Sequence, residues 1–202
     1  MPSLRKLGEV VAQGLMAGAI GYFVLWACAP PTAMPPPMPS AEGHTWSGGV
    51  AAIGGVTGFQ EPALGAHLWG HRRLGERVDL GLTAFGGYPY MFGGGAYTRV
   101  GFVMKPNLYV GGQVSAGYLY AYGSVPISYG ITDRIWVYTN PAVGVSFIGL
   151  AHIPVGVSAG LTEHLNLNVE AGMHGDFQAL VELGYFGLVT DAYGAVGLSW
   201  HK

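Results

Sequence analysis

The chain of 202 residues is poor in cysteine, in charge and in long apolar runs. Its single cysteine excludes an internal disulfide framework. Charged residues make up only 10% of the chain and its net charge is −2, which excludes the basic surface of a nucleic-acid-binding protein. After residue 28 no apolar run approaches the roughly 18–20 residues that a membrane helix needs. No segment after residue 40 shows a 3.6-residue apolar period, so a bundle of amphipathic helices is also excluded.

The start of the chain has the layout of an export signal. Arg5 and Lys6 precede an uncharged apolar run over 10–27, which is typical of a secretory signal but is almost long enough to be an uncleaved anchor. The stretch Leu25-Trp26-Ala27-Cys28 resembles the bacterial lipobox, in which an aliphatic, a variable and a small residue precede a cysteine. The resemblance implies a signal peptide over 1–27 and a diacylglycerol group on the Cys28 thiol. A cleaved signal without lipid is the other alternative.

A tether follows the cysteine. Residues 29–44 contain six prolines and few residues that form a core, so we expect an extended segment stiffened by polyproline geometry over 28–44. The remaining 45–202 is long enough for one domain, and the sequence as a whole has 35 glycines and 12% aromatic residues.

Apolar and other residues alternate throughout this domain. In 78–85 (VDLGLTAF) and 165–173 (LNLNVEAGM) every second residue is apolar, a period that predicts β-strands. Short turn signals between such runs predict antiparallel hairpins. Segment 120–133 is either a long loop or a further strand arm, which leaves eight or twelve strands as alternatives to ten. The ten expected strands are 46–57, 62–73, 77–86, 95–104, 108–119, 134–146, 152–161, 165–173, 179–187 and 192–200.

The less apolar face of these strands indicates which side meets water. It carries mostly Gly, Ser, Thr, Asn and Tyr with isolated charges, which suits the interior of a narrow barrel better than a solvated surface. The apolar face then meets lipid, and closure of the sheet satisfies every backbone group in the bilayer. We therefore predict an all-β fold, an antiparallel up-and-down transmembrane β-barrel of about ten strands.

The chain resembles the small bacterial outer-membrane β-barrel superfamily over about 45–202. The resemblance rests on the alternating strands, on the turns LGERVDL (74–80) and LTEHLNL (161–167), and on a last strand AYGAVGLSW (192–200). It implies a place in the outer membrane, lipid-anchored through Cys28 and membrane-spanning, with outer-membrane lipid, the barrel-assembly machinery and the lipoprotein-sorting machinery as partners.

With the ten strands expected above and the carboxyl end in the periplasm, the turn at 162–164 lies on the outer side of the membrane. If that turn is periplasmic instead, 120–133 must contain strand.

The resemblance leaves the function open, because the family holds structural barrels, narrow pores, adhesion factors and some lipid-modifying enzymes. We expect a structural barrel or a narrow passive channel, with no enzymatic activity and no cofactor. The alternatives are a lipid-modifying enzyme, or an interaction barrel using the tyrosine-rich stretches at 88–92 and 118–122. The sequence leaves the oligomeric state open.

A network of inward-facing polar residues is the candidate site. The acids need partners in a confined interior, and Arg99 can bind one carboxylate in bidentate fashion. Such a network either fixes the barrel like a plug or forms an acidic constriction in a cation-leaning pore. Its expected members are Asp79, Arg99, Glu170, Glu182, His67 and His71.

Metal binding and catalysis have weaker support. On a strand, His67 and His71 lie roughly 13 Å apart, at about 3.3 Å per residue, which is too far for two ligands of one ion. His174 and Asp176 could form a catalytic pair with Ser124 or Ser146, but the sequence has no G-x-S-x-G motif, and a simple polar turn is favoured.

Overall fold

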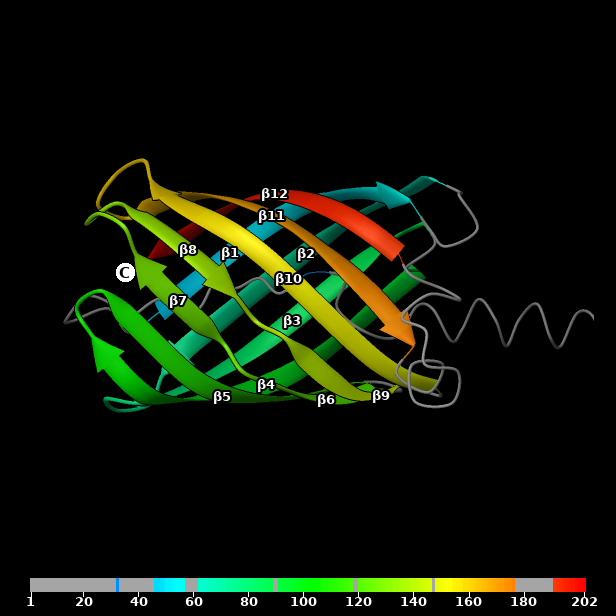
Figure 1. The fold of residues 1–202 in the computed structure, drawn as a ribbon, viewed down its shortest axis with the longest axis horizontal. Helices are drawn as coiled ribbons and strands as arrows, with labels where there is room; N and C mark the ends of the chain where they lie inside the picture. The colour runs from blue at the N-terminus through cyan, green and yellow to red at the C-terminus, as the bar shows by residue number, and fades with distance from the viewer. Residues whose placement is uncertain are drawn as a thin grey trace, which may run out of the picture.

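The computed structural model describes residue 32 and the ranges 46–56, 62–88, 91–117, 120–146, 148–176 and 191–202. The described elements are β-strands of one antiparallel sheet, which closes into a barrel (Figure 1). No helix among these residues is long and apolar enough to span a bilayer. The strands are β1 (Trp46–Val56), β2 (Pro62–Arg73), β3 (Val78–Tyr88), β4 (Met91–Lys105), β5 (Leu108–Gly117), β6 (Tyr120–Ser124), β7 (Ile127–Gly130), β8 (Ile135–Thr139), β9 (Ala142–Ser146), β10 (Ile148–Gly160), β11 (Leu165–Asp176) and β12 (Asp191–His201).

The first and last strands close the barrel. β1 pairs with β12 from Ser47 opposite His201 to Val56 opposite Ala192. At the chain's end, the Trp46 nitrogen donates to the Lys202 oxygen and the Lys202 nitrogen donates to the Trp46 oxygen, at 3.2 and 2.9 Å. Every strand therefore has two neighbours, which removes the exposed edges that lipid would not tolerate.

The twelve strand segments occupy ten positions in the wall. β6 and β7 both pair with β5 in one unbroken register, and β8 and β9 both pair with β10 in another. The interruptions fall at 125–126 and 140–141, where Pro126 and Pro141 have no N–H to donate to the ladder. The predicted antiparallel barrel of about ten strands is confirmed.

Two details of the predicted strand order need comment. Segment 120–133 contains strand rather than a long loop, which was one of the two alternatives. The strand expected at 179–187 lies outside the described residues, and β11 pairs directly with β12.

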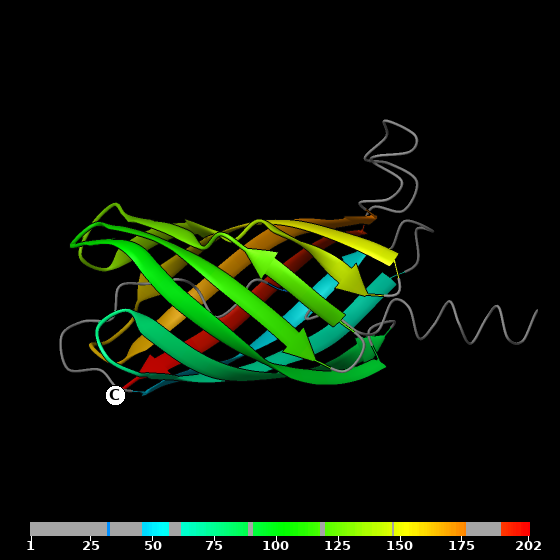
Figure 2. The same ribbon diagram turned by 90° about the horizontal axis from the view of Figure 1, so that it is seen from below.

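The short turns gather at one end of the barrel. The segments 74–77, 106–107, 131–134 and 161–164 lie at the end where β1 begins and β12 finishes (Figures 1 and 2). The turn at 162–164 is therefore on the same side as the carboxyl end, which is the second of the two placements, the one that requires strand within 120–133. The reason is that 120–130 supplies a strand, which reverses the direction of the following segments.

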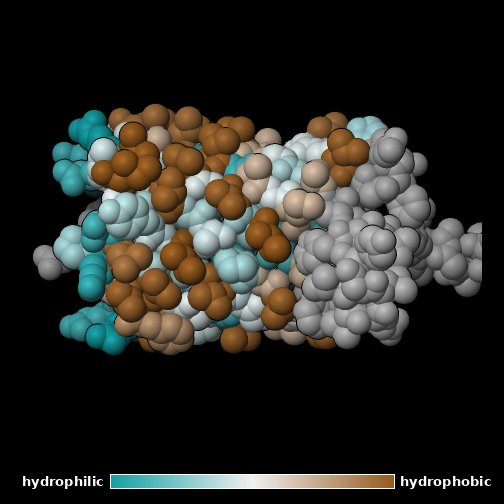
Figure 3. Space-filling view, in the orientation of Figure 1, coloured by the Kyte–Doolittle hydropathy of each residue, from teal (hydrophilic) through white to brown (hydrophobic). Residues whose placement is uncertain are grey.

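Residues that alternate along the sequence face alternately the outside and the inside of the barrel. Exposed apolar side chains cover the wall, and hydrophilic ones gather at the short-turn end (Figure 3). Along β3, Leu80 and Leu82 are exposed while Asp79 and Thr83 are buried. Five apolar residues from different strands are exposed in the same way: Leu80, Val100, Val114, Val169 and Leu198.

Glycines on the inner face let aromatic rings lie across the interior. A Cβ at Gly81 would overlap the ring of Tyr97, and one at Gly156 would overlap the ring of Tyr138. Both glycines are the direct cross-strand neighbours of these tyrosines. The missing side chain is therefore the space that each ring fills.

Candidate functional site: the barrel interior

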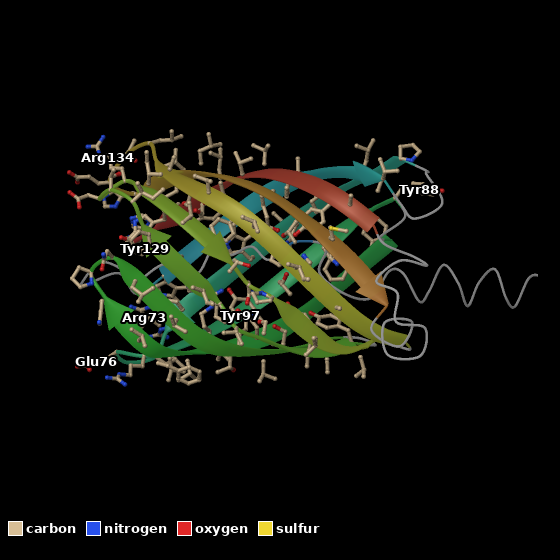
Figure 4. All side chains as sticks on the ribbon, viewed as in Figure 1. Arg73, Glu76, Tyr88, Tyr97, Tyr129 and Arg134 are labelled. Carbon is tan, nitrogen blue, oxygen red and sulfur yellow. The ribbon has the colours of Figure 1, made fainter. Side chains whose placement is uncertain are left out.

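Large side chains fill the inside of the barrel. Eight aromatic residues that point inward are only 2–7% exposed, which means that water barely reaches them. The all-side-chain view places Arg73 and Tyr97 within the outline of the barrel, Glu76 and Arg134 at the short-turn end, and Tyr88 at the opposite end (Figure 4). The buried aromatic residues are Trp69, Phe85, Tyr97, Tyr109, Tyr120, Trp136, Tyr138 and Tyr193.

A row of charged and amide side chains crosses β2, β3, β4 and β5. Arg73, Asp79, Arg99 and Gln113 are successive cross-strand neighbours on the inner face. The Arg73 Nε donates to Asp79 Oδ1 at 3.0 Å, and the Arg99 Nε donates to Gln113 Oε1 at 3.1 Å. Cations and acceptors thus alternate along the row, and its two charge-assisted hydrogen bonds join β2 to β3 and β4 to β5.

Aromatic and hydroxyl groups flank this row. The Arg99 guanidinium lies 5.8 Å from the centre of the Tyr97 ring, a distance at which a cation is attracted to an aromatic face. His71 Nδ1 lies 3.1 Å from the Tyr97 hydroxyl. Gln113 Nε2 donates to the Ser115 hydroxyl at 3.1 Å. The cluster is thus held by several weak and moderate contacts besides its ion pair.

A second cluster surrounds Glu170. The hydroxyls of Tyr138 and Tyr193 donate to its two carboxylate oxygens, at 3.1 and 2.6 Å. His152 Nε2 lies 2.7 Å from the Tyr193 oxygen, and because that hydroxyl donates to Glu170, the histidine is the donor here. His174 stacks on His152 with ring centroids 4.1 Å apart. A histidine–tyrosine–carboxylate chain of hydrogen bonds thus runs through the interior.

A third contact joins the wall to the start of the chain. His67 Nδ1 lies 2.6 Å from the hydroxyl of Thr32, and His67 Nε2 bonds to the hydroxyl of Thr83. The imidazole lies among rings, with the centroids of Trp69 and Phe85 at 5.5 and 6.4 Å. Thr32 is 2% exposed and His67 is 1% exposed. Both residues are therefore inside the barrel.

The structure distributes the expected network over these three groups. It buries His67, Asp79, Arg99 and Glu170 in the interior, with His71 half-buried. Asp79, Arg99 and His71 gather in the first cluster, Glu170 lies in the second, and His67 makes the contact with Thr32. Cys28 and Glu182 lie outside the described residues.

Two other expectations are corrected. The sequence predicts a polar turn at His174, but β11 runs to Asp176, so His174 is part of the wall and stacks on His152. The interaction alternative expects Tyr120 and Tyr122 in a surface loop, but they belong to β6. Tyr120 is buried, and the two rings stack at 5.8 Å. Tyr120 and Tyr122 therefore belong to the barrel wall rather than to a loop.

Several interior residues were missed by sequence reasoning. Arg73, Gln113, Tyr138 and Tyr193 carry the first two clusters beside the expected members. The alternation of the sequence predicts that these side chains face inward. Their partners, however, lie on other strands, and the sequence does not give the register between those strands. Among the described residues, no three His, Cys, Asp or Glu side chains are grouped so that they could hold a metal ion.

Comparison with known proteins gives the fold class. No protein-family model matches the chain, and a search of curated proteins finds no relative. The KdgM porin in complex with disordered oligogalacturonate is similar in structure, with a TM-score of 0.50 and 9% identity over 75% of this chain and 98% of that one. The NanC porin has a TM-score of 0.50 and 6% identity over the same shares, 75% and 98%.

A third solved structure is the outer membrane protease OmpT from Escherichia coli, with a TM-score of 0.48 and 8% identity over 79% of this chain and 97% of that one. At such identities the likeness concerns the fold alone. The chain has the fold of bacterial outer-membrane β-barrels.

Proposed function

We propose that the protein is a structural outer-membrane barrel with a packed, charged interior, held to the membrane in addition by lipid on Cys28. The main observation behind this proposal is that eight aromatic side chains and Arg99 are buried in the barrel interior. A small barrel has only enough interior for its own side chains, whereas a porin keeps a polar, water-filled lumen. An interior filled with rings and hydrogen-bonded charges stabilises the wall and leaves little room for a solute.

A narrow passive channel is the second candidate, because some interior hydroxyls have no protein partner among the described residues. Buried hydroxyls of this kind are usually satisfied by ordered water. A thin file of water past the Asp79 and Arg99 row would pass small ions and select them by charge. The hydroxyls concerned belong to Tyr120, Ser124, Ser128 and Ser158.

Planar bilayers separate the two candidates. We expect the folded wild-type protein to insert without stable open steps, or with steps far smaller than those of a general porin measured in the same chamber. Heat-modifiable migration on a gel serves as the control that the protein is folded before insertion. Large, steady steps from folded protein would overturn the packed interior, and small cation-selective steps would favour the narrow channel.

Lipidation of Cys28 is a separate prediction, motivated by Leu25-Trp26-Ala27-Cys28 and the proline-rich stretch behind it. The mature wild-type chain should begin at residue 28 and carry the mass of a diacylglycerol group, and Cys28→Ser should lose both features. Mass spectrometry of the detergent-extracted protein measures this, with Ala29→Ser as a control that keeps the lipid. An identical amino terminus in wild type and Cys28→Ser, with masses that differ only by the exchange of sulfur for oxygen, would exclude the anchor.

A further inference from the structure

A cation lies on the outer face of the barrel wall near the short-turn end. Arg72 is exposed and shares the outward face of β2 with Leu68, which is 54% exposed. A guanidinium at a lipid-facing surface needs an anionic partner or water, because hydrocarbon solvates it poorly. Among the described residues, no carboxylate forms an ion pair with Arg72. The partner of this cation therefore has to come from outside the described wall.

Two exposed tryptophans frame the arginine. Trp46 is its direct cross-strand neighbour, and the guanidinium carbon of Arg72 lies 5.5 Å from the centre of the Trp46 ring. Trp46 and Trp200 are 56% and 51% exposed. Tryptophan is enriched where a membrane protein meets the lipid head groups. The two rings therefore indicate that Arg72 lies at head-group depth, and the cation–π contact orients its guanidinium without using the N–H donors.

The charge of this end of the barrel favours an anion. Trp46 exchanges two backbone hydrogen bonds with Lys202, whose exposed side chain adds a second cation beside the tryptophan. An excess of cations at the edge of a membrane protein attracts anionic lipid head groups. The exposed ionised side chains of the short-turn end are five cations and three acids, namely Arg72, Arg77, Lys105, Arg134 and Lys202 against Glu76, Asp133 and Glu163.

Next to the arginine, toward the middle of the barrel, the wall lacks side chains. Gly48 and Gly70 are cross-strand neighbours on the outer face, two positions further from the short-turn end than the tryptophan–arginine pair. A Cβ at Gly70 would meet one heavy atom within 4 Å, at 3.8 Å, whereas a Cβ at Gly48 would lie 3.0 Å from the Trp200 ring. Leu82, the other neighbour of Gly70, is 68% exposed. Gly70 is thus an open position between two large apolar side chains.

We propose that Trp46, Gly70, Arg72 and Trp200 form a binding site for an anionic phospholipid of the leaflet that surrounds the short-turn end. Arg72 donates to the lipid phosphate, whose oxygens match the fork of a guanidinium, and an acyl chain lies across Gly70. A zwitterionic head group carries its own cation, which the positive side chains repel, so a net negative head group is preferred. The inference rests on the proposed place of the wall in a bilayer, but not on the packed interior or on lipid at Cys28.

Native mass spectrometry of the full chain, folded in an uncharged detergent, tests the phosphate contact. With phosphatidylglycerol added, we expect one lipid to be retained per barrel. Arg72→Gln should raise the apparent dissociation constant by about tenfold or more, the effect of losing a hydrogen bond to a charged group. Arg77→Gln removes one exposed cation from the following turn, which makes the same change in net charge, and should leave the constant unchanged.

Gly70→Leu tests the acyl contact and retains every cation. A leucine fills the open position beside the guanidinium, so binding of phosphatidylglycerol should weaken several-fold. Ala66→Leu, at another exposed outward position of β2, is the matched control and should bind as the wild type does. Diacylglycerol, which lacks the phosphate, should be retained no better by the wild type than by Arg72→Gln. Heat-modifiable migration on a gel confirms that each variant is folded.

Equal dissociation constants for Arg72→Gln and Arg77→Gln would overturn the phosphate contact, and equal constants for the two leucine variants would overturn the acyl contact. Displacement of the lipid by an equal concentration of inorganic phosphate would show that the site takes a small anion rather than a lipid. The bound lipid is lost when the protein is denatured, whereas a diacylglycerol on Cys28 would persist. A large steady conductance would overturn the packed interior and leave this site standing.

Discussion

Arginine in place of Leu82 should destabilise the folded protein in lipid by about 2–4 kcal/mol, the cost of a cation on the lipid face at the bilayer midplane. Leu82 is 68% exposed in the middle of β3, with Gly70 and Ala96 as its cross-strand neighbours. These neighbours offer no charge or hydrogen bond to a guanidinium. An arginine there must reach along the wall to the headgroups or draw water into the hydrocarbon.

Urea midpoints in lipid vesicles measure the loss, and Leu74→Arg is the matched control. Leu74 is also apolar and 50% exposed, but it lies in the turn between β2 and β3. There an arginine should cost about 0–1 kcal/mol. Leu82→Ala separates the loss of the leucine from the presence of the charge. Equal effects of the two arginines would mean that the middle of β3 does not face hydrocarbon.

The wall could be predicted from sequence because its signal is local. The pleat sends successive side chains to opposite faces, and lipid outside demands an apolar residue at every second position. β3 and β11 satisfy this over most of their length, as Leu80, Leu82, Leu167 and Val169 show. The strand at 120–130 was harder to recognise because its outward residues include Ala121 and Gly123, which are too small to give a clear apolar period.

The site could be predicted only in part, because its contacts depend on closure and register. The positions of Asp79, Arg99 and Glu170 in the alternating pattern predict that all three face inward, but they do not predict which residues they contact. Tyr138 reaches Glu170 across 32 positions and His152 reaches Tyr193 across 41, distances that no local pattern encodes. Thr32 is further removed still, since no period or motif marks a tether residue as part of the barrel interior.

Replacing Arg99 by methionine should cost about 3–5 kcal/mol of stability, the range for breaking a buried charge network. Arg99 is 1% exposed between Asp79 and Gln113, its cross-strand neighbours, and it donates to Gln113 Oε1. Methionine keeps the apolar stem but removes the charge and every donor. Asp79 then keeps Arg73 at 3.0 Å but loses the cation on its other side, in a place where water cannot replace it.

A double-variant cycle identifies the cause. If Arg99 chiefly compensates the charge of Asp79, Arg99→Met combined with Asp79→Asn should be less destabilised than the sum of the two single variants, with a coupling of about 0.5–3 kcal/mol. Urea unfolding in detergent gives each value, and Val100→Met, on the outer face of the same strand, is the control for the methionine itself. The loss of stability of Arg99→Lys should lie between zero and that of Arg99→Met, because lysine retains the charge but not the planar donors of the guanidinium. If Arg99→Met costs no more than Val100→Met, water reaches the guanidinium, and the interior at β4 is wet rather than packed.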